Sequence, residues 1–157
     1  MSNTSQYRIL PPGIHEMNLE EVGKLFGDVP MSLHRLRLFE VLKKYAERLR
    51  TLQIGTALIV DGSFVMPQVK KPADIDVVLV MPEGWEKPIE KIPQEQYNLL
   101  SPVSVEDVFT GLHLFVVAEN SPEYHAWIRY FSRIKGNWRI MFDIPQNILK
   151  GFIRVTL

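Results

Sequence analysis

Two short apolar runs stand out in the middle of the chain, at residues 57–60 and 77–80. Continuous apolar runs of this length, bounded by turn residues, are typical of strands that are buried on both faces. The first run ends in Asp61-Gly62-Ser63, and Gly62 permits a tight turn there because it has no Cβ. The pattern predicts a strand, a turn, a loop and a second strand over residues 57–80.

A helical pattern precedes these strands. Ser32 is a helix-capping residue, and apolar residues then recur at spacings of four and three, which predicts a helix over residues 33 to about 52. The apolar stripe consists of Leu38, Leu42, Tyr45, Leu49 and Leu52. The basic residues of this helix are Arg35, Arg37, Lys43, Lys44, Arg48 and Arg50. We expect them to form a solvated face balanced by Glu40 and Glu47; the alternative is a partner or substrate surface.

Shorter elements surround this central unit. Asn18 and Glu21 have the spacing of a capping box and predict a helix over residues 19–26, after a proline-rich turn at 10–13. Residues 82–102 are expected to be irregular, and Ser104 with Asp107 to cap one helical turn. A third strand is predicted at 112–118. Ser121-Pro122 then begins a helix whose buried stripe reaches Ile134, and two β-like pieces follow at 138–142 and 151–157.

These elements predict an α/β (α+β) fold, with a mixed sheet of about four strands flanked by helices. The 157 residues fit one domain over 1–157, with a flexible tail at 1–9. The formal net charge is zero, so no long-range field favours a long nucleic acid template or an anionic membrane. The absence of cysteine excludes thiol catalysis and disulfides. No signal peptide or apolar run of about 20 residues is found, so we expect a cytoplasmic protein.

Candidate chemistry lies at the start of the second strand. Asp74 and Asp76 point to the same face, about 7 Å apart, because side chains alternate along a strand. Two carboxylates that close repel each other unless a cation lies between them, and Mg²⁺ or Mn²⁺ prefers such oxygen ligands. A phosphate can approach the backbone at Gly62, and the Ser63 hydroxyl can donate to it. The residues therefore predict a site for a nucleoside triphosphate.

The spacing Gly62-Ser63, ten residues, Asp74-x-Asp76 resembles the signature of minimal nucleotidyltransferases of the DNA polymerase β superfamily. The stretches LPPGIHEMNLEEV, DGSF with DIDVVLV, and LFVVAENSPEYHAWI also resemble a bacterial family of unknown function with a nucleotidyltransferase-like fold. The resemblance covers about residues 10–157. It implies that the Gly-Ser turn holds the triphosphate, and that the two aspartates bind the metal ions that assist nucleotidyl transfer.

The same resemblance implies a third acid on the third strand, where this chain has His113. A neutral imidazole can bind a metal ion but brings no negative charge, and the alternative is a core histidine bonded to a backbone carbonyl. Other acids that could substitute are Asp61, Asp107 and Glu119. Two metal ions are therefore less well supported than one.

Basic and aromatic residues near the motif leave further alternatives. Lys70 and Lys71 lie in the loop between Ser63 and Asp74, where they could contact the β- or γ-phosphate or simply aid solubility. Trp85 could stack on a base or anchor the long loop. The remaining histidines share no ligand spacing, so structural roles are expected; they are His15, His34 and His125.

The leading functional prediction is transfer of a nucleoside monophosphate from a triphosphate such as ATP to a hydroxyl of a protein or an RNA, with Mg²⁺ or Mn²⁺ as cofactor. By resemblance alone, small members of this superfamily suggest a role in a toxin–antitoxin pair or a defence system. The alternative is a degenerate member that binds a nucleotide or a partner without turnover.

Overall fold

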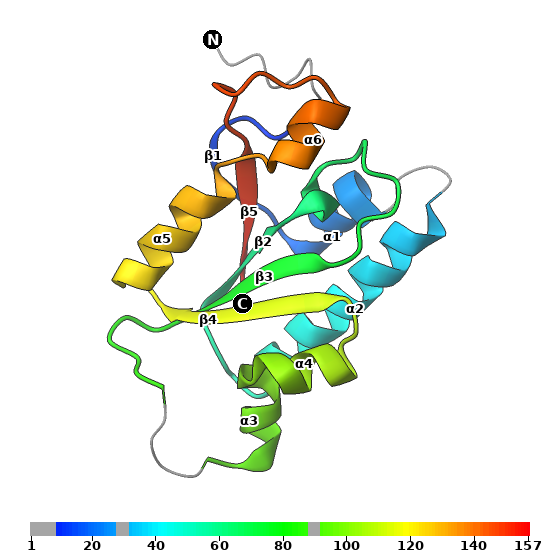
Figure 1. The fold of residues 1–157 in the computed structure, drawn as a ribbon. Helices are drawn as coiled ribbons and strands as arrows, with labels where there is room; N and C mark the ends of the chain where they lie inside the picture. Colours follow the sequence, from blue (N-terminus) through cyan, green and yellow to red (C-terminus); the bar gives the residue numbers. More distant parts are fainter. Residues whose placement is uncertain (1–8, 28–31, 88–91) are drawn as a thin grey trace.

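The computed structural model describes residues 9–27, 32–87 and 92–157, and its centre is a five-stranded mixed sheet in the order β1-β5-β2-β3-β4 (Figure 1). The strands are β1 (Gly13–Glu16), β2 (Ala57–Asp61), β3 (Ile75–Met81), β4 (Leu112–Ala118) and β5 (Gly151–Thr156). β2 runs antiparallel to both β3 and β5, while β1 pairs with β5 and β3 with β4 in parallel. The predicted fold class is confirmed, although about four strands was one too few.

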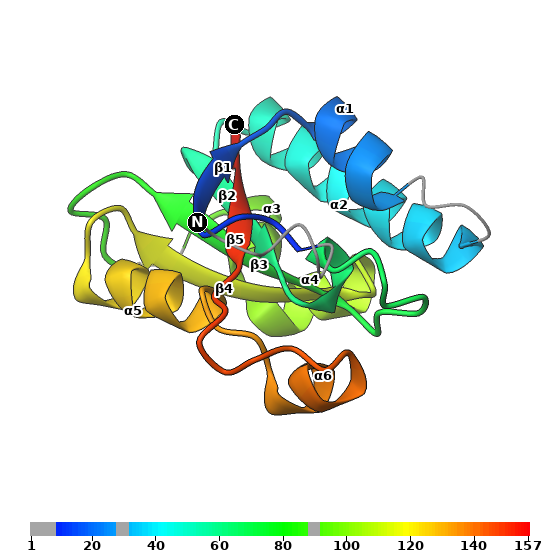
Figure 2. The ribbon, with the colours of Figure 1, turned by 90° about the horizontal axis from the view of Figure 1, so that it is seen from above.

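Helices cover both faces of the sheet. In chain order they are α1 (Leu19–Val22), α2 (Leu33–Thr51), α3 (Gln94–Leu100), α4 (Pro102–Val108), α5 (Pro122–Phe131) and α6 (Gly136–Met141). A π-helical turn, η2 (Gly23–Gly27), continues α1, and a 3₁₀ turn, η3 (Ser63–Val65), follows β2. Figure 2 shows α1 and α2 on one side of the sheet, with α5 and α6 on the other. None of the helices in the described ranges is both long and apolar enough to cross a bilayer.

The central strands β2 and β3 are buried along their whole length because helices cover both faces. Alternate side chains enter two separate cores. Those on the α2 side are Leu58, Val60, Val77 and Leu79. Those on the α5 side are Ala57, Ile59, Val78 and Val80. This two-sided burial explains why both strands appear in the sequence as continuous apolar runs.

Three predicted helix starts are confirmed by their hydrogen bonds. Asn18 and Glu21 form a reciprocal capping box, in which each side chain accepts from the other residue's backbone N–H. Ser32 Oγ accepts from the backbone N–H of Arg35 at the start of α2. Ser121 Oγ accepts from the backbone N–H of Tyr124 at 3.1 Å, which begins α5. These contacts satisfy amide groups that the first helical turn leaves without partners.

Other local predictions were wrong. The expected β-like piece at 138–142 belongs to α6, where the Arg139 side chain donates to the carbonyls of Ile134, Pro145 and Ile148 and so ties the helix to its flanking loops. The segment at 82–102, expected to be irregular, contains α3, and Ser101 rather than Ser104 caps α4.

The N-terminal region also departs from expectation. The strand β1 begins at the last residue of the predicted turn at 10–13. It pairs with β5 from the other end of the chain and is largely exposed, so no local alternation of apolar and polar residues predicts it. The predicted tail at 1–9 lies outside the described residues except for Ile9, which is buried.

Arg35 is the largest departure from the predicted solvated face of α2, because its side chain is completely buried. Its guanidinium N–H groups donate to five backbone carbonyls, those of Phe26, Ser63, Phe64, Met66 and Val69. Burial lowers its pKa to about 10, so it stays charged at neutral pH. One side chain of α2 thus fixes the loop that follows β2.

We expect Arg35→Met to lower the free energy of unfolding by about 4 kcal/mol or more, because five carbonyls lose a charged donor, although those of Ser63 and Met66 keep a backbone N–H. Arg35→Lys should recover only part of this loss, since one ammonium cannot reproduce the planar fork of donors. The matched control is Arg37→Met, an exposed arginine on the same helix, which should change stability by less than about 0.5 kcal/mol. Urea titrations of the three variants measure these differences; equal losses in Arg35→Met and Arg37→Met would contradict the role of Arg35.

Candidate functional site

The turn after β2 has a geometry that requires glycine. Gly62 has φ of +86°, a conformation that side chains rarely adopt. A Cβ at this position would lie 3.0 Å from Asp76 Oδ2 on the neighbouring strand. The chain then turns into η3, which begins with Ser63. The turn therefore brings backbone and the Ser63 side chain close to the first acid of β3.

Strand register places three polar residues in one row across the sheet. Asp61 of β2 is opposite Asp76 of β3, and Asp76 is opposite His113 of β4. Asp74 lies one residue before β3 begins, so it joins the same face as Asp76. Asp61, Asp74 and Asp76 thus lie together at one end of the otherwise apolar central strands.

His113 lies beside the two aspartates rather than in the core. Its ring is exposed, and Nδ1 is 3.3 Å from Asp76 Oδ1. Each of Asp74, Asp76 and His113 offers a ligand atom, and these atoms lie within 4.8 Å of one another. The arrangement can accommodate one divalent cation, with two carboxylate oxygens and one imidazole nitrogen as ligands.

The electrostatics of Asp74 also favour a cation. Burial, and then the charge of Asp76, raise the pKa of Asp74, while His113 and Lys135 act in the opposite direction. A raised pKa for a carboxyl group means that its negative charge is poorly compensated in the folded protein. A bound cation would provide that compensation.

A buried ion pair lies next to this cluster. Lys150, the residue before β5, donates through Nζ to Asp61 Oδ1 and, at 2.9 Å, to the carbonyl of Phe131. Asp61 and Lys150 are 3% and 4% exposed. Burial raises the pKa of Asp61 to about 6 even though Lys150 acts to lower it. Asp61 therefore has a partner within the protein and is not among the ligand atoms of the cluster.

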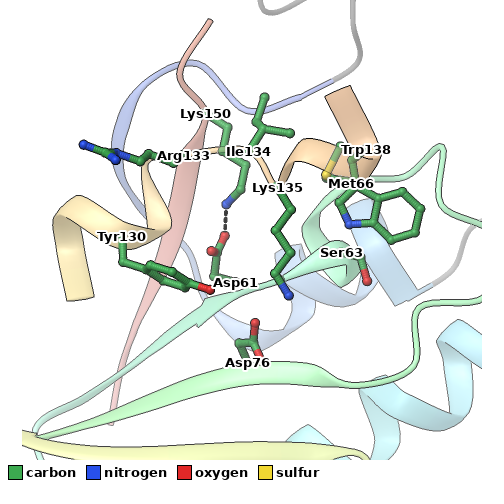
Figure 3. Close-up of a pocket in the computed structure, with 11 residues that line it drawn as sticks. Asp61, Ser63, Met66, Asp76, Tyr130, Arg133, Ile134, Lys135, Trp138 and Lys150 are labelled. Carbon is green, nitrogen blue, oxygen red and sulfur yellow. Dashed lines mark hydrogen bonds and ion pairs between the residues drawn. The ribbon is translucent and has the colours of Figure 1, made fainter. Parts of the chain in front are cut away.

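A pocket of about 180 Å³ opens between the Gly62 turn and the connection from α5 to α6 (Figure 3). Its lining consists of Asp61, Gly62, Ser63, Met66, Asp76, Tyr130, Arg133, Ile134, Lys135, Trp138 and Lys150. In Figure 3 the Lys135 side chain extends toward Asp76 and Ser63, while Tyr130 and Trp138 stand on either side. The pocket thus combines an acidic floor, a cationic side chain and aromatic walls.

Residues 2–156 match the sequence profile of a Family of unknown function (DUF6932). The chain belongs to this family. Comparison of this DUF6932 chain with curated proteins and with solved structures finds no match. The family description states no activity, so the resemblance to the nucleotidyltransferase superfamily stays a prediction.

The lysines expected at the phosphates lie elsewhere in this DUF6932 chain. Lys70 and Lys71 are exposed and are not part of the pocket lining, and the backbone carbonyl of Lys70 accepts from Ser32 Oγ at the start of α2. The cations at the pocket are Arg133, Lys135 and Lys150, which were not predicted. For Lys150 the available signal was its charge directly before the predicted β-like piece at 151–157.

The other acids proposed as substitutes are separate from the cluster. Glu119 pairs with Arg154 at 2.9 Å, and Asp107 is exposed on α4. Trp85 packs against the larger core, which favours the anchoring alternative.

The remaining histidines have structural contacts, as expected. His15 Nε2 donates to the carbonyl of Pro11, and His34 Nε2 to the carbonyl of Pro72. The His125 ring packs edge-on against Tyr124.

We expect Lys150→Met to lower the free energy of unfolding by about 3–5 kcal/mol at pH 8, because it leaves Asp61 buried without a counter-charge. In this variant the pKa of Asp61 would rise further above its usual 3.8. The folded variant would therefore bind the proton of the Asp61 carboxyl group more tightly than the unfolded chain does. Stability must then fall as the pH rises from about 4 through the folded pKa, and the deficit of the variant should be smaller at pH 5.5 than at pH 8.

Asp61→Asn combined with Lys150→Met removes both charges and should recover much of this loss. Urea titrations at the two pH values measure the effect. A deficit in Lys150→Met that is equal at pH 5.5 and pH 8 would show that the charge of Asp61 is not what Lys150 compensates.

Proposed function

We propose that this chain is a metal-dependent nucleotidyltransferase, which moves a nucleoside monophosphate from a nucleoside triphosphate to a hydroxyl group of a protein or an RNA. The observation that carries the proposal is the meeting of Asp74, Asp76 and His113 beside the Gly62–Ser63 turn. A ligand set for a divalent cation, next to a turn that a phosphate can approach, suits the α-phosphate chemistry of a triphosphate.

Each residue has a role that its position supports. Asp74 and Asp76 would hold the Mg²⁺ or Mn²⁺ ion, with His113 as a third ligand. Gly62 permits the close approach of Asp76 to the turn, and the Ser63 hydroxyl could donate to a phosphate oxygen. When bound, the ion supplies charge neutralisation at the phosphates and activation of the attacking hydroxyl. The protein's contribution is to position the triphosphate for in-line attack at the α-phosphorus.

A second candidate function is a degenerate member that binds a nucleotide or a partner without turnover. It is favoured by His113, which stands where the superfamily pattern has a third acid. The carboxylate of Asp61, which lies opposite Asp76 on β2, is held by Lys150 and offers no substitute. Two carboxylates compensate less of the positive charge of two metal ions than three carboxylates would. Binding without transfer separates this candidate from the first.

The acceptor and the biological setting belong to the same proposal. The zero net charge supports a small or local acceptor rather than a long template. A protein partner in a toxin–antitoxin or defence system rests on the resemblance alone.

Incubation with each α-labelled triphosphate, Mg²⁺ or Mn²⁺, and candidate protein or RNA acceptors should give labelled acceptor, detected on a gel. Asp74→Asn and Asp76→Asn should each lower the rate of transfer about 100-fold or more, because each removes a charged metal ligand. Both variants should remain folded, since the substitution relieves repulsion between the two carboxylates.

Asp107→Asn is the matched control, because it neutralises an exposed acid on α4 that lies outside the cluster. It should transfer label at the parent rate. Metal-dependent nucleotide binding without any transfer would support the non-catalytic candidate. Transfer at the parent rate by Asp74→Asn and Asp76→Asn would contradict both candidates.

A further inference from the structure

Three cationic side chains, those of Arg133, Lys135 and Lys150, line the pocket that faces the acidic cluster. A triphosphate carries several negative charges, so a site that binds one needs a cation that can reach it. The three side chains differ in whether their charge is available for this purpose.

Lys150 is already neutralised. Its Nζ donates to Asp61 and to the carbonyl of Phe131, and both ionised groups are buried. Withdrawing Lys150 toward a ligand would leave the Asp61 carboxylate unpaired in the protein interior, which is strongly unfavourable. Lys150 therefore fixes the floor of the pocket and is not free to bind a phosphate.

Arg133 contributes to the pocket wall, but its guanidinium extends away from Asp76 and Ser63 (Figure 3). Its side chain is exposed to solvent. A ligand at the Gly62 turn would therefore meet the stem of Arg133 rather than its charge.

Lys135 has the opposite orientation. Its Nζ lies over the pocket and is directed at the space between Asp76 and Ser63 (Figure 3). Within the described part of the chain the Lys135 ammonium makes no side-chain hydrogen bond and no ion pair within 4 Å. The ammonium thus faces the acids without being bound to them.

The backbone at Lys135 is fixed while its side chain is exposed. Ile134 is buried in a small core with Met66, directly beneath the pocket, and its carbonyl accepts from Arg139 Nε at 3.1 Å. Lys135 itself is the residue that precedes α6. A side chain anchored in this way can change partners by rotating about its own bonds, without movement of the helices.

We propose that Lys135 binds the phosphate chain of the substrate, and that in the metal-free protein the same ammonium stands in for the metal ion by compensating Asp74 and Asp76. This rests on the proposed function, since it assumes that the cluster binds a metal ion and the turn a polyphosphate. It assigns the phosphate-binding role to Lys135 rather than to Lys70 and Lys71. The two roles have opposite effects on affinity. Lys135 weakens the binding of the metal ion alone, because the two compete for Asp74 and Asp76, and it strengthens the binding of the metal-bound polyphosphate.

Isothermal titration calorimetry with Mn²⁺ alone, and with inorganic tripolyphosphate in the presence of Mn²⁺, tests the proposal. Lys135→Met should bind Mn²⁺ about 3-fold more tightly, because a competing positive charge is gone. It should bind Mn²⁺–tripolyphosphate about 10-fold or more weakly, because a charge-assisted contact is lost. Arg133→Met is the matched control, with a charge removed from the same connection, and should change both affinities by less than about twofold. The double variant Lys70→Met with Lys71→Met should behave like this control.

A parent protein that binds neither Mn²⁺ nor Mn²⁺–tripolyphosphate would overturn both the proposed function and the role of Lys135. A parent that binds both, with Lys135→Met indistinguishable from Arg133→Met, would overturn only the role of Lys135. Weakening of both affinities in Lys135→Met would also overturn it, because a merely structural residue would have that effect. Loss of tripolyphosphate binding in the Lys70→Met, Lys71→Met variant alone would return the phosphate contact to that loop.

Discussion

The buried guanidinium of Arg35 is the interaction on which the arrangement of the site depends. The segment after Gly62 forms only one 3₁₀ turn, and among its carbonyls those of Ser63 and Met66 accept from a backbone N–H. Arg35 donates to four carbonyls of this segment, those of Ser63, Phe64, Met66 and Val69. Buried carbonyls without a donor are costly, and so this one side chain determines where the loop can lie.

The position of this loop and the buried Lys150–Asp61 ion pair together determine which acids remain at the site. With the loop fixed on α2, Gly62 and Ser63 face Asp76 across the strand boundary. On the other side, the Lys150–Asp61 pair ties β2 to β5 and to the end of α5 through the carbonyl of Phe131. The internal pair removes one acid from the site. Asp74 and Asp76 remain beside His113, and a metal ion would bind their carboxylates.

Elements whose structure depends on neighbouring residues could be predicted from the sequence, and elements that depend on distant contacts could not. The β2–turn–β3 unit and the starts of α1, α2 and α5 depend on neighbours in sequence, and their residues were sufficient. The strand β1 forms by pairing with β5, which is more than a hundred residues away along the chain. The helix α6 is held by Arg139, whose side chain donates to carbonyls of the loops on both sides. Neither contact leaves a local pattern.

The candidate site divides in the same way. Asp74, Asp76, Gly62 and Ser63 were found because their spacing is local, whereas Lys135 and Lys150 reach the site from segments that are distant in sequence. Arg35 is an instructive case, because it lies three residues before Leu38 and so continues the apolar stripe of α2. Helical periodicity indicates that position 35 is buried, but the charge of arginine led to the prediction that it is exposed.

The measurement that tests the central claim most directly is anomalous diffraction from crystals grown with Mn²⁺ and a non-hydrolysable nucleoside triphosphate. Our account predicts an anomalous peak within about 2.3 Å of carboxylate oxygens of both Asp74 and Asp76, with the phosphates against the Gly62–Ser63 turn. A peak at any other acids, or a triphosphate bound away from this turn with the cluster empty, would contradict it.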